Sequence, residues 1–139
     1  MKVNVEWKQQ MQFESHTPSG HQIIMDASEE SGGANTGPRP TEILLGAVGT
    51  CTGIDIVEIL RKMRLPLERF DLNVSGERAE EHPRKFTQIH LEYHLSGDLP
   101  ADKVKRAIEL SVEKYCSVSH SLSAKIHVSY TINGQLYRL

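Results

Sequence analysis

The chain has 139 residues, 38% of them hydrophobic and 24% charged, which fits one globular domain over residues 1–139. Lys and Arg (16) nearly offset Asp and Glu (18), so the net charge of −2 gives no electrostatic reason to expect nucleic acid or anionic lipid as a partner. No uninterrupted apolar run approaches the ~18 residues that cross a bilayer, and the N-terminus lacks the apolar stretch of a signal peptide. We therefore expect a cytoplasmic protein with no membrane and no nucleic-acid partner.

The N-terminal region is predicted to form a hairpin followed by a loop. Residues 3–7 alternate apolar and polar side chains, as a half-buried strand does, and residues 21–26 form a second apolar run after the Thr17–Gly20 turn. Residues 28–38 contain three Gly, one Pro and no large apolar side chain. This composition indicates a surface loop, which is also suited to act as a mobile lid.

A long central helix is predicted to begin at Thr41. Apolar residues crowd this segment and no proline interrupts it before Pro66, so a helix of about five to six turns fits. Its first half is apolar on nearly every side, which predicts burial all round and more cover than a small sheet supplies. Its end carries Arg61, Lys62 and Arg64, which complement the helix dipole.

The rest of the chain is predicted to alternate paired strands with helices. Residues 70–75 and 89–95 alternate apolar and polar side chains and predict two long antiparallel strands. A second helix should begin near residues 98–100 and end near Cys116, a short helix should follow over 117–123, and a last strand over 126–132. Paired strands with helices between them predict an α+β fold with mainly antiparallel sheets.

Two cysteines are too few for a disulfide-built scaffold, so they are either packing residues or reactive groups. Cys51 lies about ten residues into the apolar helix, beyond the reach of the terminal dipole, and both burial and Asp55 at i+4 disfavour its thiolate. A reactive Cys51 therefore needs a cation from elsewhere. Arg39 lies about 18 Å away along the same helix axis at ~1.5 Å per residue, so only an antiparallel partner helix brings it close. The alternative is that Cys51 is a small packing residue.

Cys116 stands at the junction of two predicted helices, where N–H groups and the dipole of the second helix favour its thiolate. Cys116 and His120 also share a helical face, which leaves a zinc site with Cys51 as an alternative, although its fourth ligand is unassigned. The strand triplet His90, Glu92 and His94 is interpreted as polar exterior. No phosphate-binding Gly-rich loop or nucleophile-elbow motif is present, and we expect neither a cofactor nor a metal.

Two motifs carry a family resemblance. The segment Arg39-Pro40-Thr41-Glu42-Ile43-Leu44-Leu45-Gly46-Ala47-Val48-Gly49-Thr50-Cys51, followed later by Tyr115-Cys116-Ser117-Val118-Ser119, resembles the OsmC/Ohr family of osmotically inducible and organic hydroperoxide resistance proteins. The resemblance implies an intertwined homodimer, with two central helices back to back between sheets and the cysteines meeting at the subunit interface. It also implies that Cys51 is the peroxidatic thiol and Cys116 the resolving thiol, with an organic hydroperoxide as substrate and an external dithiol as reductant.

This chemistry sets a geometric requirement. A peroxidatic thiolate attacks the O–O bond, becomes a sulfenic acid and condenses with a nearby thiol to form a disulfide. The two Cα atoms must then come within roughly 4.4–6.8 Å. An apolar pocket around the thiol would select organic over hydrophilic peroxides.

The chain departs from the family pattern at the activating residues. Members of the family place an Arg in the N-terminal hairpin and a Glu directly after the first motif's proline, but residues 9–38 contain no Arg or Lys and Thr41 follows Pro40. Arg39 and Glu42 of the other subunit are the expected replacements, whereas Arg39 as a loop-end residue is the alternative. Ser117 replaces a proline that often follows the second cysteine. We therefore expect a less characterised OsmC-like branch.

Two functional hypotheses follow. The first is a cofactor-free dimeric thiol peroxidase of oxidative stress defence, with Cys51 and Cys116 reacting and Arg39 and Glu42 activating. The alternative is a non-catalytic protein that binds a small apolar or electrophilic ligand in a dimer-interface pocket lined by the cysteines.

Overall fold

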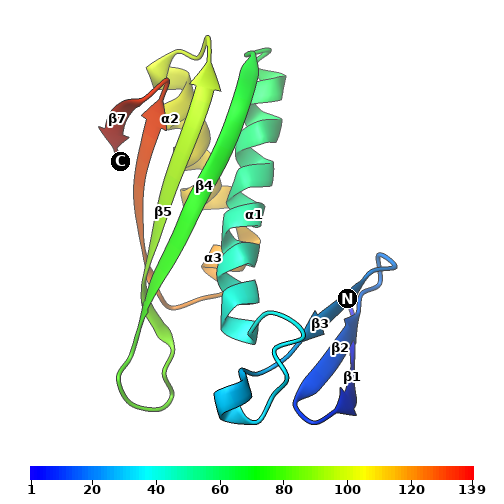
Figure 1. Cartoon of the computed structure of the whole chain (residues 1–139). Helices are drawn as coiled ribbons and strands as arrows, with labels where there is room; N and C mark the ends of the chain where they lie inside the picture. The colour runs from blue at the N-terminus through cyan, green and yellow to red at the C-terminus, as the bar shows by residue number, and fades with distance from the viewer. The chain divides into compact units, whose positions relative to one another are not determined.

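The computed structural model describes all residues, Met1–Leu139, as two compact units, Met1–Leu44 and Leu45–Leu139, which are taken separately (Figure 1). The first unit holds a three-stranded antiparallel sheet of β1 (Asn4–Gln9), β2 (Gln12–His16) and β3 (Gln22–Met25). The predicted pairing of the first and last of these strands is wrong, because each pairs with β2 instead. Gln10, with a φ of 47°, turns the chain back early and creates this middle strand.

The loop between β3 and the first helix is confirmed as a surface segment, and hydrogen bonds to Asp26 hold several of its residues. Asp26 is 3% exposed, and its carboxylate accepts hydrogen bonds from the backbone N–H groups of Ala27 (2.7 Å), Ala34 (3.2 Å) and Thr36 (3.1 Å). The Thr36 hydroxyl donates a fourth bond over 2.7 Å. These donors, with Thr36 first among them, lower the pKa of Asp26 to about 2. The loop includes the short helix η1 (Glu29–Ser31), and its residues after η1 are hydrogen-bonded to the Asp26 carboxylate.

The second unit holds a four-stranded sheet in the order β4 (Leu67–Arg78), β5 (Phe86–Gly97), β6 (Lys125–Ile132) and β7 (Gln135–Arg138). The β4–β5 and β6–β7 pairs are antiparallel, as the prediction of mainly antiparallel sheets requires, whereas β5 and β6 are parallel. The crossover between them contains α2 (Ala101–Leu110), the π-helical turn η2 (Ser111–Tyr115) and the short helix α3 (Ser117–His120). The last strand, β7, was not predicted from the sequence.

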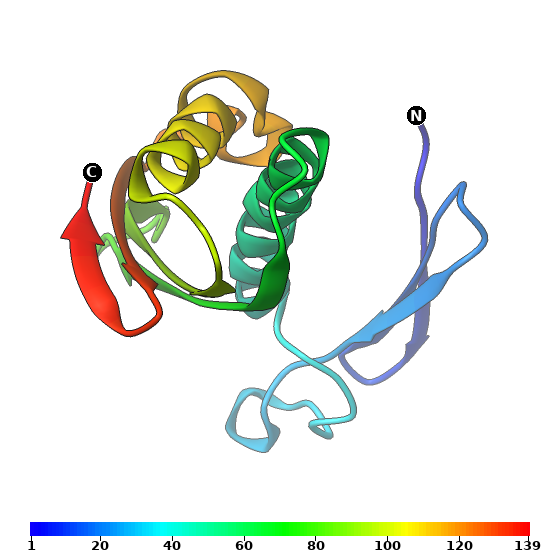
Figure 2. The ribbon, with the colours of Figure 1, turned by 90° about the horizontal axis from the view of Figure 1, so that it is seen from above.

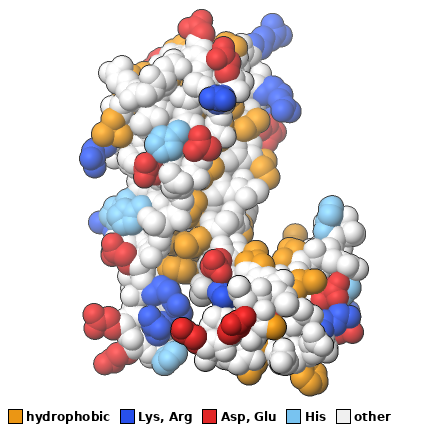
Figure 3. Space-filling model, in the orientation of Figure 1, with side chains coloured by type: hydrophobic (Ala, Val, Ile, Leu, Met, Phe, Trp, Pro, Cys, Tyr) orange, Lys and Arg blue, Asp and Glu red, His pale blue; other side chains and the backbone are white.

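The long helix α1 (Pro40–Lys62) confirms the predicted central helix, and from Leu45 onward it belongs to the second unit. Figure 2 shows α1 and α2 on the same face of the four-stranded sheet. Alternating residues of the strands point into the core between sheet and helices, and the fully buried members include Val48, Ile56, Leu60, Ile89, Leu91, Tyr93, Val104 and Ile108. The opposite face of the sheet is polar, and Figure 3 shows histidine and acidic side chains scattered over it.

Within this single chain α1 is not buried all round, and its predicted all-round burial depends on cover from a second copy. Val48, Ile56 and Leu60 are fully buried against the sheet, but Ile54 on another side of the helix is 61% exposed. By length and composition α1 is also the one helix able to cross a membrane, although only 28% of its most apolar stretch is buried inside the chain. One such helix is weak evidence for a membrane protein, since the core helix of a soluble protein passes the same test. The relevant feature is an apolar helix face that this chain leaves open.

Candidate active site

Cys116 lies at the start of α3, as the sequence predicted. It is fully buried and is the N-cap residue of this helix. The backbone N–H of Ser119 donates to the Cys116 sulfur over 3.4 Å, and the Ser119 hydroxyl donates to the Cys116 carbonyl over 3.2 Å. A capping thiol of this kind is held in one position and is already in contact with a hydrogen-bond donor.

The two cysteines lie near each other within one chain. Cys51, half-buried on α1, is a neighbour of Cys116, and the Cys116 side chain and the backbone N–H of Val118 both act on its pKa. Both cysteines are in the free thiol form. The crossover from β5 to β6 contains Cys116 between η2 and α3, and Figure 2 shows the helices of this crossover on the face of the sheet on which α1 packs.

The environment of Cys51 favours the neutral thiol. Burial raises the pKa of Cys51 above its ordinary value, and the neighbouring Cys116 and Asp55 raise it further. The Val118 N–H acts in the opposite direction but does not prevail. The sequence argument that Asp55 at i+4 disfavours the thiolate is thus confirmed. Within this chain Cys51 is a protonated thiol at neutral pH.

A hydrogen-bonded bridge joins η2 to α1 beside the two cysteines. The Ser111 hydroxyl donates to Asp55 Oδ2 over 2.8 Å and lies 3.4 Å from the Thr52 carbonyl oxygen. Ser111 and Thr52 are both fully buried. Sequence reasoning did not single out Ser111, although a polar residue among the apolar positions of the second helix was a usable signal. The bridge fixes the π-helical turn that leads into Cys116.

Arg39 and Glu42, the predicted activating residues, lie together at the start of α1. The Arg39 backbone N–H donates to Glu42 Oε1 over 2.9 Å, so Glu42 caps the helix. The Arg39 guanidinium donates to Asn35 Oδ1 (2.8 Å) and to the Gly37 carbonyl (3.0 Å). In this chain both residues therefore have the loop-end arrangement that the sequence left open as an alternative.

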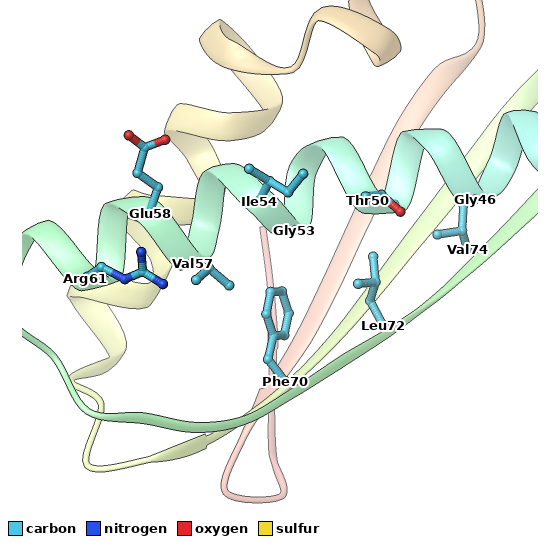
Figure 4. Close-up of a pocket in the computed structure, with 11 residues that line it drawn as sticks. Gly46, Thr50, Gly53, Ile54, Val57, Glu58, Arg61, Phe70, Leu72 and Val74 are labelled. Carbon is cyan, nitrogen blue, oxygen red and sulfur yellow. The ribbon is translucent and has the colours of Figure 1, made fainter. Parts of the chain in front are cut away.

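An apolar groove of about 720 Å³ runs along the open side of α1 (Figure 4). Phe70, Leu72 and Val74 of β4 line it from below, and Gly49 of α1 lets the helix approach the strand closely, since a Cβ there would lie 2.7 Å from Val74 Cγ2. Glu58 and Arg61 stand at one end. The groove is continuous with the exposed Ile54.

The zinc interpretation lacks a set of ligands. No group of three or more His, Cys, Asp or Glu side chains lies close enough to hold a metal ion. The ring Nε2 of His120 is instead 2.9 Å from the Val112 carbonyl oxygen.

Comparison with known proteins shows which proteins this chain is similar to. A family model described as "OsmC-like protein" matches residues 32–131. Protein YhfA of Escherichia coli strain K12 is 38% identical over 132 residues, which cover 94% of this chain and 96% of YhfA. The crystal structure of a hypothetical protein from Aquifex aeolicus VF5 is 29% identical with a TM-score of 0.83, covering 94% of both chains. An organic hydroperoxide resistance protein OsmC from Legionella pneumophila covers 94% of both chains with a TM-score of 0.67 and 14% identity, a likeness of fold alone.

Proposed function

Since this chain belongs to the OsmC-like protein family, we propose that it is a thiol-dependent peroxidase that reduces organic hydroperoxides. The observation that carries this proposal is that Cys51 and Cys116 are neighbours within one chain, close enough for Cys116 to act on the pKa of Cys51. Both are free thiols, and two neighbouring free thiols in one chain are the pair that a peroxidatic cycle closes into a disulfide.

The reaction has three steps. The Cys51 thiolate attacks the terminal oxygen of the hydroperoxide, so the O–O bond breaks, the alcohol leaves and a Cys51 sulfenic acid forms. The Cys116 sulfur then attacks the Cys51 sulfur, and water leaves as the disulfide forms. An external dithiol reduces this disulfide and returns both cysteines to thiols. We place the protein in the cytoplasm, where such dithiols are kept reduced.

The first step requires activation from outside the chain. Burial and Asp55 hold the pKa of Cys51 high, so the protein needs a positive charge close to this sulfur. We assign this charge to the Arg39 guanidinium of a second copy, with Glu42 of that copy as the residue that holds the Arg39 backbone in place. Their own helix cannot deliver them, because Arg39 and Cys51 are about 18 Å apart along the axis at ~1.5 Å per residue.

A homodimer is supported by apolar surface that one chain leaves uncovered. The groove beside α1 and the 61% exposed Ile54 form one such surface. The three-stranded sheet of the first unit exposes Val5, Trp7 and Phe13 by 57%, 62% and 43%. Soluble proteins rarely leave large contiguous apolar patches open, and such patches mark protein interfaces.

The raised pKa of Cys51 also favours a second candidate function. A thiol that stays protonated reacts slowly with peroxides, and the apolar groove would then serve to bind a small apolar or electrophilic ligand without catalysis. This alternative predicts slow oxidation by peroxides but a rise in melting temperature when the ligand is added.

Peroxide consumption separates the two functions. With dithiothreitol as reductant, the protein should consume cumene hydroperoxide faster than hydrogen peroxide, and Cys51→Ser should abolish this turnover. Turnover that survives Cys51→Ser, or equal rates with both peroxides, contradicts an organic hydroperoxide reductase that acts through Cys51.

A further inference from the structure

The two cysteines differ in how far their own chain encloses them. Cys116 is 0% exposed, whereas Cys51 is only half-buried on α1. The cover over Cys116 comes from this chain alone, so a second copy can only add to it. A path to Cys51 must stay open in a working assembly, because the hydroperoxide reacts there. A molecule that arrives from outside therefore reaches the sulfur of Cys51 and not that of Cys116.

The sulfur of Cys116 is also prepared to carry a negative charge. The backbone N–H of Ser119 donates to the Cys116 Sγ atom over 3.4 Å. The Ser119 hydroxyl donates to the Cys116 carbonyl over 3.2 Å and holds the same turn of chain. A sulfur that already accepts a bond from an N–H group keeps this donor when it becomes a thiolate, and the bond is then charge-assisted.

Cys51 is the poorer leaving group of the two. Burial raises the pKa of Cys51, and the neighbouring Cys116 and Asp55 raise it further. Ser111 holds the Asp55 carboxylate through a hydrogen bond of 2.8 Å. In thiol–disulfide exchange the more accessible sulfur is attacked, and a thiol of lower pKa leaves faster. Access to Cys51 and the poor leaving ability of Cys51 therefore favour the same direction of attack.

We propose that the external dithiol attacks the disulfide at the sulfur of Cys51, and that Cys116 leaves as a thiolate that accepts the Ser119 N–H bond. This inference rests on the proposed function, whose third step it specifies. A thiolate of the reductant forms an S–S bond with Cys51, the Cys51–Cys116 bond breaks, and Cys116 takes the electron pair and then a proton. The second thiol of the reductant then attacks the reductant sulfur of this mixed disulfide and releases Cys51, which takes up a proton. The reductant leaves as a cyclic disulfide, so two electrons and two protons have passed to the protein.

This assignment makes Cys51 the point of entry for both substrates. The hydroperoxide and the reductant each bond to the same sulfur in turn. Cys116 reacts only inside the chain, first as the thiol that attacks Cys51 and then as the thiolate that leaves it.

A monothiol tests the direction of attack, because its reaction stops at the mixed disulfide. Diamide first converts the reduced protein to the Cys51–Cys116 disulfide, so no peroxidase activity is needed. The disulfide protein is then mixed with 2-mercaptoethanesulfonate, stopped with acid at low conversion, alkylated in urea with N-ethylmaleimide and mapped by mass spectrometry. The monothiol should be found on Cys51 and the maleimide on Cys116, in at least about tenfold excess over the reverse pattern.

The urea-unfolded disulfide protein is the matched control, since both sulfurs are then open to the monothiol. It should give the two adducts in comparable amounts. If the adduct on the folded protein lies mainly on Cys116, or if its pattern equals that of the unfolded control, the inference is overturned and the peroxidase proposal stands. If diamide forms no disulfide between Cys51 and Cys116 of one chain, the inference and the proposed function both fail.

Discussion

The Ser111 hydroxyl of η2 donates a 2.8 Å hydrogen bond to the Asp55 carboxylate of α1, one helical turn from Cys51. This bond ties the segment that delivers Cys116 to the helix that carries Cys51. The same carboxylate raises the pKa of Cys51. One residue therefore supports the geometry of the cysteine pair and opposes the ionisation of its nucleophile.

The substitution Asp55→Asn removes the negative charge of this side chain and keeps its size and shape. In a Cys116→Ala background, Asp55→Asn should lower the pKa of Cys51, because a negative charge beside the thiolate is lost. More thiolate is then present at pH 7, so iodoacetamide should alkylate Cys51 several-fold faster. Glu58→Gln, which neutralises an exposed carboxylate on the same helix, should not change the rate. A rate in Asp55→Asn equal to or below that of its parent would refute this electrostatic assignment.

The open face of α1 gives a direct prediction about assembly. Ile54 is 61% exposed beside the apolar groove, and a second copy would bury it. Ile54→Glu should convert a dimer to a monomer in size-exclusion chromatography with light scattering, because a charge cannot be buried unpaired in an apolar interface. Leu136→Glu, at a residue of β7 that is 56% exposed, should leave the dimer intact. A monomeric parent protein, or a dimeric Ile54→Glu protein, would contradict the proposed interface.

Two glycines on α1 should differ in their tolerance of alanine. A Cβ at Gly49 would lie 2.7 Å from Val74 Cγ2, whereas a Cβ at Gly53 would make ordinary contacts at 3.8 Å and 3.9 Å. Overpacking costs about 1–3 kcal/mol and alanine gains about 0.5–1 kcal/mol over glycine in a helix. Urea unfolding should show Gly49→Ala less stable by about 1 kcal/mol and Gly53→Ala at least as stable as the parent. Equal stability of the two variants would mean that the helix shifts away from β4 freely.

The lowered pKa of Asp26 leads us to expect that the folded protein loses stability in acid. Its pKa lies at about 2 in the folded protein, below the ordinary value of 3.8. The folded state thus favours the carboxylate, so its stabilising contribution is complete above pH ~4 and is lost as the pH falls to ~2. Asp26→Asn should lower the free energy of unfolding at pH 6 and have little effect near pH 2. Exposed Glu29→Gln should show no such dependence, and an Asp26→Asn deficit that persists at pH 2 would contradict the assignment.

The sequence predicted the elements whose pattern is local. The apolar run after Thr41 predicted α1, and the alternation of residues 70–75 and 89–95 predicted β4 and β5. The pairing of strands depends on where the chain turns, and it was harder to predict from the sequence. Gln10, a non-glycine residue with positive φ, gave no sign of the turn that creates β2. The parallel β5–β6 pair depends on a crossover that packs only once the core has formed.

The candidate site was predictable in part. The helix junction at Cys116 was predicted from the sequence, and the i+4 spacing correctly placed Asp55 near Cys51. Contacts between distant segments could not be predicted from the sequence. Ser111 reaches Asp55 across 56 positions. Asp26 was overlooked because its four donors lie mostly in a loop whose composition suggested mobility.

The most direct measurement is mass spectrometry of reduced protein after one equivalent of cumene hydroperoxide. We expect rapid loss of both thiols and a peptide pair joined by a Cys51–Cys116 disulfide, with the chain still a monomer on a non-reducing gel. Both thiols remaining free at millimolar peroxide would contradict it, as would a disulfide that joins two chains.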